Sequence, residues 1–555
     1  MTIPSPRSFD RRSFLLGACP AALPLTTPLV RPRDDADDMA AAARLAGLDF
    51  TAEERQQAGR RLARARSGYE AVRQQPIPFE LGPCTVFDPL PPGALRAPAT
   101  GPVAFAIPAA VKRPASDADL AFASIPELAS LLRQRAVSSV QLVELALARL
   151  QRFDPQLLCV VNLLRDQALA RAKNLDAELA AGKDRGPLHG IPYGAKDLFA
   201  WPGAPTTFGA APWQDHIWPI TATCLQQLYD AGAVLVAKLS LGALAMGDLW
   251  HRGRTRNPWQ PEQGSSGSSA GPATAVAAGL VPFAIGTETL GSIVSPCVRC
   301  GVAGLRPTFG TISRFGAMPL SWTMDKAGPI ARTAVDAALV FDAMRGRDGK
   351  DPAVVDTAFP WRAGAGLAGL RFGLLQGREF PSRPGDAAFV AWLEGQGVEL
   401  APVTLPPAPY EGMLAMLHAE SAAAFDEALR QGLLPRLPGQ AESDWPNQFR
   451  AARTIPAVEY IQASRARSAL VAAMDEALAG IDVLVAPTHG PLLTASNLTG
   501  HPTYVLPVGR TDADGGRPTM LGLTGRLYGE AAILAVAEAW QAATDHHRGR
   551  PALVQ

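Results

Sequence analysis

GSSGSSAGPATAVAAGLVPFAIGTETLGS, residues 264–292, is the stretch that decides the fold. Pro272 suits the first turn of a helix, where its missing N–H would have no partner, and Gly279 suits the residue that ends one. Residues 281–286 are short and apolar enough to form a buried strand. The stretch therefore predicts a helix that leaves one edge of a sheet and a strand that returns to it.

Two serines flank this helix–strand unit. Ser268 precedes the helix and Ser292 follows the strand, so the fold of the unit brings them close together. Open α/β sheets bind ligands at the carboxyl edge of their strands, and both serines are expected there. Lys196 ends another apolar run, and its amine reaches the same crevice if the two strands are parallel.

The turn that ends at Ser292 is shaped by glycine. Gly291 permits a backbone conformation that other residues rarely adopt, and the N–H groups of Thr289, Leu290, Gly291 and Ser292 can then point into one concavity. Such a nest suits a developing oxyanion. Glycine–serine runs are often flexible linkers, but this one is flanked by an apolar helix and an apolar strand.

Apolar runs alternate with helical patterns along most of the chain. Two capping boxes, at Ser124 and Ser138, begin helices, and the second helix is expected to stop at Asp154-Pro155. Strands are expected over 189–196, 233–238, 281–286, 370–375 and 482–487, and helices over 221–230, 272–278, 412–432 and 457–478. This alternation favours an α/β sandwich with a largely parallel central sheet.

Four motifs make the sequence resemble the amidase signature family, which includes peptide amidases and the A subunits of glutamyl-tRNA amidotransferases. They are LHGIPYGAKD at 188–197, GSS at 267–269, GTETLGSIV at 286–294 and GLRPT at 304–308. The resemblance covers residues 118–550, which we expect to form one domain. It implies an α/β fold with a large mixed, mostly parallel central sheet, covered by helices on both faces.

The resemblance also implies a catalytic triad of Lys196, Ser268 and Ser292, with a cis peptide at Ser268. A serine hydroxyl needs an adjacent base, and lysine is a base only when it is neutral. Burial and hydrogen bonding must therefore lower its pKa from about 10.4. Ser292 is the expected nucleophile, and the backbone of Thr289, Leu290, Gly291 and Ser292 forms the expected oxyanion hole.

The chemistry implied is hydrolysis of a carbon–nitrogen bond in a linear amide, through an acyl-enzyme and without a metal or cofactor. Val294 stands where many family members carry arginine, as in the peptide-amidase-like branch. Leu290 replaces the common Asp or Gly, which leaves the backbone donors intact. Cys297 and Cys300 are expected to be packing residues, because no second pair exists for a zinc site.

Two alternatives remain open. Residues 267–271 match G-x-S-x-G with Ser269 as the nucleophile of an α/β-hydrolase-type esterase, although residues 255–266 lack the strand that such an elbow needs. The chain could instead be a non-catalytic component, or one similar to the A component of an amidotransferase. His501 is expected to be packed or hydrogen-bonded, and the loop 250–259 either lines the cleft or packs.

The N-terminal part predicts an exported protein. Residues 10–16, DRRSFLL, resemble a twin-arginine signal within residues 1–33 and favour a periplasmic location; Cys19 suggests a less favoured lipid anchor. Residues 34–117 form an extension with a helix over 51–74 and a proline-rich wrap.

The net charge of +1 in 555 residues gives no footprint for nucleic acid. We expect a small-molecule amide as partner and no membrane span; the oligomeric state is left open.

Lysine is scarce in this chain. Seven lysines stand among 52 basic residues, at 112, 173, 183, 196, 238, 326 and 350. Arginine cannot lose its proton in the working range, so it could not replace a catalytic base. Lys196 is expected to be required by chemistry, Lys112, Lys173, Lys183 and Lys350 to lie on the surface, and Lys238 and Lys326 are left undecided.

Overall fold

The computed structural model describes residues 35–58, 74, 81, 83, 85–91, 94–377, 380–511 and 515–555. The chain divides into two units, residues 1–76 and 77–555. In the first unit, α1 spans Asp35–Leu45. The capping box at Thr51 is present, since Glu54 N donates to Thr51 Oγ1 and Thr51 N to a Glu54 carboxylate oxygen. The helix expected over 51–74 is confirmed over residues 52–58. Its remainder, the expected signal and Cys19 lie outside the described residues.

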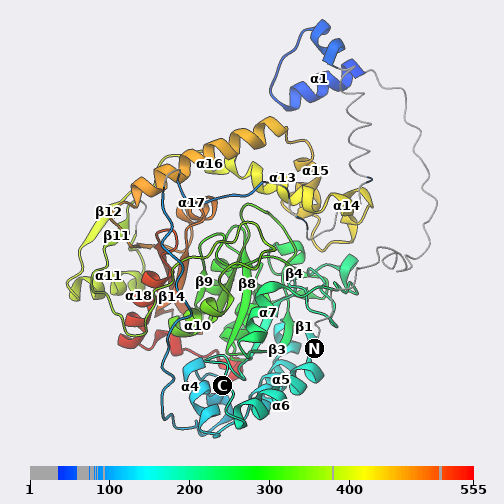
Figure 1. Ribbon diagram of the computed structural model, residues 1–555. Helices are drawn as coiled ribbons and strands as arrows, with labels where there is room; N and C mark the ends of the chain where they lie inside the picture. Colours follow the sequence, from blue (N-terminus) through cyan, green and yellow to red (C-terminus); the bar gives the residue numbers. More distant parts are fainter. Residues whose placement is uncertain are drawn as a thin grey trace, which may run out of the picture. The chain divides into compact units, whose positions relative to one another are not determined.

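The larger unit is built on a sheet of eleven strands in the order β1-β3-β2-β8-β10-β9-β14-β15-β13-β11-β12. The strands are β1 Val160–Leu163, β2 Pro192–Lys196, β3 Val234–Leu239, β8 Phe283–Glu288, β9 Gly304–Arg306, β10 Lys326–Ala331, β11 Phe372–Leu375, β12 Leu400–Val403, β13 Val483–Ala486, β14 Thr503–Arg510 and β15 Pro518–Gly525. Two small hairpins pair β4 Leu249–Trp250 with β5 Gly253–Arg254, and β6 Arg256–Asn257 with β7 Gln260–Gly264. Figure 1 shows β8 and β9 within this unit.

The larger unit also contains α-helices. They are α3 Asp117–Leu120, α4 Ile125–Arg133, α5 Ser139–Leu157, α6 Arg165–Ala180, α7 Thr223–Asp230, α8 Ala270–Ala277, α9 Val294–Cys300, α10 Ala334–Met344, α11 Pro384–Gly395, α12 Tyr410–Met413, α13 Ala415–Ala424, α14 Asp426–Arg430, α15 Trp445–Ala452, α16 Ala457–Ala477, α17 Pro491–Thr499 and α18 Glu530–Ala543. Among the described residues, no helix is both long and apolar enough to cross a bilayer.

The large mixed sheet is confirmed, but the expected predominance of parallel strands is wrong. Six of the ten neighbouring pairs are antiparallel. Parallel pairing is confined to β3-β2-β8 and to β13-β11-β12. The alternation of strands and helices holds in those two groups, whereas β14 and β15 form a hairpin that needs no crossover helix.

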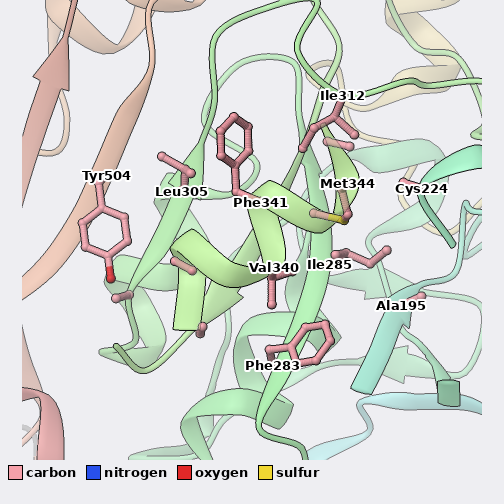
Figure 2. Packing of buried hydrophobic residues seen from close by; sticks show 14 of the residues in the cluster. Ala195, Cys224, Phe283, Ile285, Leu305, Ile312, Val340, Phe341, Met344 and Tyr504 are labelled. Atoms are coloured by element: carbon pink, nitrogen blue, oxygen red, sulfur yellow. The ribbon is translucent and has the colours of Figure 1, made fainter. Parts of the chain in front are cut away.

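Helices lie on both faces of the sheet, as expected. Along β8, Phe283 and Ile285 belong to one hydrophobic core and Ala284 belongs to the other, because successive side chains of a strand point to opposite faces. The first core includes residues of α4, α7 and α10, and the second includes residues of α5, α6, α8 and α9. Figure 2 shows Val340, Phe341 and Met344 of α10 packed near β8.

The expected elements are found with shifted ends. Both capping boxes, at Ser124 and Ser138, are formed. Helix α5 runs on to Leu157 with Pro155 inside it, and Asp154 then accepts the N–H groups of Cys159 and Val160. The helix expected over 412–432 is broken into α12, α13 and α14.

Replacing Phe283 with alanine tests the core beneath the site. The Phe283 ring is fully buried and stacks on Tyr193 of β2, with centroids 5.0 Å apart. The cavity left behind should cost about 3–5 kcal/mol of the free energy of unfolding, measured by urea denaturation. Leu95→Ala, at a side chain that is 93% exposed, is the control and should change it by less than about 0.5 kcal/mol. Equal stability of the two variants would contradict this packing.

Candidate active site

Parallel pairing of β2 and β8 brings the predicted site residues to one edge of the sheet. Tyr193, Gly194 and Ala195 of β2 face Phe283, Ala284 and Ile285 of β8. Lys196 is the last residue of β2, and Ser292 lies between β8 and α9. Ser268 lies just before α8, and the next residue, Ser269, donates its N–H to the carbonyl of Ser292 at 3.0 Å. The proximity expected of the two serine segments is therefore found.

Lys196 is completely buried and points at polar oxygens. Its Nζ donates to Ser268 Oγ at 2.8 Å and to Thr287 Oγ1 at 2.8 Å. Burial lowers the pKa of Lys196 from its ordinary value of 10.5 to about 7, although the charges of Asp325 and Glu288 act in the opposite direction. A substantial fraction of this amine is therefore neutral near pH 7.

The two serines differ in exposure. Ser268 is 1% exposed and follows a cis peptide bond from Gly267. Gly267 packs so closely on the backbone that a Cβ there would lie 1.8 Å from the Gly247 carbonyl oxygen. Ser292 is partly exposed. Ser268 is thus buried with the amine that it contacts, whereas Ser292 is the more accessible of the two serines.

The turn from Thr289 to Ser292 is held at both ends. Gly291 has a φ of +90°, which accounts for glycine at this position. Thr289 Oγ1 donates to Asp325 Oδ1 at 2.6 Å. At the other end, the carboxylate of Glu288 accepts the N–H groups of Ile293 and Val294 at 2.8 and 2.9 Å. Glu288 thereby fixes the backbone that directly follows Ser292.

Glu288 is part of a buried ion pair that the sequence did not reveal. Arg306 Nη1 donates to Glu288 Oε1 at 2.8 Å, and both side chains are completely buried. Burial acts to raise the pKa of Glu288, but the charge of Arg306 and the hydrogen bonds outweigh it and lower the pKa to about 2. Nη2 of Arg306 donates to Ser496 Oγ, to the His501 carbonyl and to Thr503 Oγ1. Glu288 and Arg306 each lie in one of the four sequence motifs, but nothing in those motifs shows that the two side chains form an ion pair.

Asn497 completes the hydrogen bonding of Glu288. Its Nδ2 donates to Glu288 Oε1 at 2.8 Å. The carboxylate thus accepts from two backbone amides, one guanidinium and one side-chain amide. A buried charge is tolerated when it is paired and hydrogen-bonded in this way.

Burial separates the seven lysines into two groups. Lys112, Lys173, Lys183 and Lys350 are exposed, as expected, whereas the other three are buried. Lys238 Nζ lies 2.7 Å from Asp197 Oδ1 and forms a buried ion pair with it, which is a structural contact. Lys326 donates to the carbonyl of Met324, and burial lowers its pKa well below the ordinary value.

The remaining sequence candidates have structural contacts. Ser269 Oγ donates to the Thr287 carbonyl at 3.0 Å and accepts the Thr287 N–H at 3.1 Å, so it is held in the backbone of β8. Cys297 and Cys300 are buried free thiols whose pKa burial raises, to about 12 for Cys300. His501 is buried beside Thr499 Oγ1 at 2.7 Å.

The loop 250–259 packs against the protein at three points. Trp250 and Asn257 are buried, and Trp259 Nε1 donates to the carbonyl of Cys300 at 2.8 Å. These contacts favour the packing interpretation of the loop for those residues. Over the described part of the chain, no group of three His, Cys, Asp or Glu side chains is arranged to hold a metal ion.

A cavity of about 450 Å³ adjoins these groups. Thr287, which contacts Lys196, and Thr289, which begins the nucleophile turn, both line it. Its volume lies within the range of about 300–1,000 Å³ that is usual for small-molecule sites. The site therefore has space for a ligand beside the buried amine.

Comparison with known proteins identifies the family. A family model of amidases matches residues 141–505. The A component of the glutamyl-tRNA(Gln) amidotransferase of Chloroflexus aurantiacus is 32% identical over 469 residues, which cover 75% of this chain and 96% of that protein. The native peptide amidase of Stenotrophomonas maltophilia matches in structure with a TM-score of 0.68 and 32% identity, over 78% of this chain and 99% of that one. The chain belongs to the amidase family, and its resemblance to amidase signature enzymes is confirmed.

A further solved structure, of a bacterial aryl acylamidase, shares the fold with a TM-score of 0.68 at 24% identity. The structural match includes 78% of this chain and 99% of the aryl acylamidase chain. The α/β fold with a large mixed sheet is thus common to these enzymes. A member of this family is an amidase-type or amidotransferase-type protein.

Arg306→Met tests the ion pair that supports the nucleophile turn. The substitution leaves the buried Glu288 carboxylate without its cation, and breaking such a pair should cost about 3–5 kcal/mol in the free energy of unfolding. Urea denaturation measures this change. The double variant Glu288→Gln, Arg306→Met should recover part of the loss, because it removes the unpaired charge. A single variant as stable as the wild type would show that the pair does not support the turn.

Proposed function

We propose that the protein is an amidase that hydrolyses the carbon–nitrogen bond of a linear amide through an acyl-enzyme on Ser292. The observation that carries this proposal is the contact of the buried Lys196 Nζ with Ser268 Oγ at 2.8 Å. An amine whose pKa is lowered to about 7 can accept a proton at neutral pH. The family membership supports the same chemistry.

The proposed first half-reaction moves one proton along the three side chains. Neutral Lys196 accepts the proton of Ser268 Oγ, and Ser268 takes the proton of Ser292 as Ser292 Oγ attacks the amide carbonyl carbon. The carbonyl electrons move onto oxygen, where the N–H groups of Thr289, Leu290, Gly291 and Ser292 stabilise the negative charge. When the carbon–nitrogen bond breaks, Ser268 donates a proton to the leaving nitrogen and Lys196 returns one to Ser268.

The second half-reaction regenerates the enzyme. A water molecule gives its proton to Ser268, whose own proton passes to Lys196, and the hydroxide attacks the acyl carbon. The bond to Ser292 then breaks, and Ser292 Oγ regains a proton from Ser268 while Lys196 returns to the neutral state. The products are a carboxylic acid and ammonia or an amine. Glu288 acts by positioning the backbone after Ser292, through its bonds to Ile293 and Val294.

A role similar to that of the A component of an amidotransferase is the second candidate. The relatives at 32% identity bear that name, and they are covered almost completely by this chain. We favour an amidase that works alone on a small-molecule amide, since residues 10–16 resemble an export signal and the net charge is +1. We also propose that the twin-arginine motif directs the protein to the periplasm. Export of a fusion of residues 1–40 to a reporter, lost on replacement of Arg11 and Arg12 by lysine, tests this location.

Ser292→Ala should abolish hydrolysis. Purified wild-type protein, without added partners, should release ammonia or an amine from members of a library of carboxamides and peptide amides. Loss of the nucleophile should reduce kcat/KM by about 10³-fold or more. Ser295→Ala is the matched control, since Ser295 lies three residues further on, in the first turn of α9, and its hydroxyl contacts His489 Nε2 at 3.4 Å. It should keep activity within a few-fold of wild type.

Two outcomes would contradict the proposal. Unchanged hydrolysis by both Ser292→Ala and Lys196→Met would show that the reaction uses other residues. Hydrolysis that begins only after a companion protein is added would favour the amidotransferase-like role. Thermal unfolding of each variant shows whether it is folded.

The rate should depend on pH through Lys196. Because the neutral amine is the active form and its pKa is lowered to about 7, kcat/KM should rise with pH through this value and level off above it. Well below pH 7 the slope should be about tenfold per pH unit. Lys196→Arg should lack this rise and the activity, since arginine stays protonated. A wild-type profile that is level from about pH 5 to pH 9 would contradict the role of Lys196 as a base.

A further inference from the structure

A segment ahead of the four quoted motifs forms one wall of the cavity beside the site. We call residues 85–91 the strap. Thr85 and Val86 of the strap line the 450 Å³ cavity, as do Leu81 and Pro83 just before it. Leu81 and Val86 are 61% and 52% exposed. The apolar side chains of Leu81 and of Val86 in the strap are thus available to a ligand in the cavity.

The strap is anchored by Phe87. The guanidinium carbon of Arg467 lies 3.4 Å from the centroid of the Phe87 ring, and the Phe309 ring meets it edge-on at 5.2 Å. Arg467 is buried and donates to Thr323 Oγ1 at 3.0 Å and to the Thr323 carbonyl at 2.8 Å. Thr323 is next to Trp322, which also lines the cavity. The anchor therefore joins the strap to the part of the cavity wall that contains Trp322.

The charged groups around the cavity are engaged with the protein. Arg314 and Asp351 form a two-pronged ion pair, with Nε–Oδ2 at 2.8 Å and Nη2–Oδ1 at 2.9 Å. Asp325 accepts from Thr289 Oγ1 and from the N–H groups of Leu320 and Ser321. Lys350 Nζ lies 4.7 Å from the centroid of the Phe315 ring. The two carboxylates and the guanidinium are thus already paired or hydrogen-bonded, and Lys326, which also lines the cavity, donates to the Met324 carbonyl.

The rest of the lining is mostly apolar. Its side chains include Leu198, Phe199, Met318, Pro319, Leu320 and Trp322, which face the same space as Leu81 and Val86. Such a lining favours an uncharged apolar group and excludes water from it. The polar Thr287 and Thr289 mark the part of the cavity that adjoins Lys196 and the nucleophile turn.

The strap lies outside the part of the chain that defines the family, since the amidase model matches residues 141–505. The alignment with the relative from Chloroflexus aurantiacus includes 96% of that protein but only 75% of this chain. Leu81, Pro83, Thr85 and Val86, which supply this wall, thus lie outside the residues that the family model matches.

We propose that the strap determines substrate selectivity by enclosing an uncharged, bulky apolar group of the amide, aryl or branched alkyl, against the wall that contains Trp322. This inference rests on the proposed amidase function. Val86 limits the size of the group, and Phe87 holds the strap in place through its contact with Arg467. Small amides such as acetamide reach the site without using the strap.

Val86→Trp and Val86→Ala test the strap with a graded set of primary amides: acetamide, isobutyramide, benzamide and naphthamide. For Val86→Trp, kcat/KM for the two aryl amides should fall by about 10-fold or more, since filling a pocket by a few methylene volumes changes discrimination by this amount. Acetamide turnover should change less than about twofold. Val86→Ala should shift the preference toward naphthamide. Leu95→Ala, at an exposed side chain that does not line the cavity, is the control.

Phe87→Ala tests the anchor. Loss of the ring should reduce kcat/KM for the aryl amides several-fold through KM, while the rate with acetamide and the rise in rate with pH persist. A structural defect of the catalytic domain would change acetamide turnover and the pH profile as well. If Val86→Trp, Phe87→Ala and Leu95→Ala give the same order of substrates as the wild type, the strap does not select the substrate.

Binding separates failure of this inference from failure of the proposed function. In the Ser292→Ala background, calorimetry with benzamide should show binding that Val86→Trp weakens by about 10-fold or more and that Leu95→Ala leaves unchanged. This result would support the strap even if the wild type cleaved no amide in the set. Equal binding by Val86→Trp and Leu95→Ala, or no binding of benzamide by any of these proteins, would overturn the inference.

Discussion

The geometry of the candidate site depends on the interactions of one residue, Glu288, which ends β8. Its carboxylate accepts the backbone N–H groups that follow Ser292 and forms an ion pair with the buried guanidinium of Arg306. Arg306 in turn bonds to residues of α17 and β14. A nucleophile on an unsupported loop would lose the alignment that an oxyanion hole requires. The chain instead fixes this loop to three separate parts of the fold.

Much of the site could be predicted because its residues lie in short, local patterns. The helix that follows Ser268 and the strand that precedes Ser292 were readable from Pro272, Gly279 and the apolar run between them. The approach of Lys196 depended on whether β2 is parallel to β8, which the sequence left open and the structure establishes. The roles of the three side chains in catalysis remain a proposal.

The parts that could not be predicted depend on contacts between distant residues. The partner of Glu288 is 18 residues away and that of Arg467 is more than 140 away, and no local pattern records such pairs. The sheet is less parallel than expected for another reason: every antiparallel pair includes a strand that was not among the expected ones, namely β1, β9, β10, β14 or β15. Lys238 and Lys326 look alike in sequence, and only their surroundings distinguish an ion pair from an amine bonded to a carbonyl.

The anchoring of Phe87 by Arg467 has a consequence for the order in which the molecule is completed. The strap is among the first parts of the larger unit to leave the ribosome, whereas α16, which carries Arg467, is among the last. Contacts between such distant segments form late, since a long loop must close before they do. The nucleophile turn is completed later still, because Arg306, the partner of Glu288, bonds to Ser496 and Thr503, which follow α16 in the chain. A nascent chain would therefore gain both the anchored strap and the supported nucleophile turn only after these late segments have emerged.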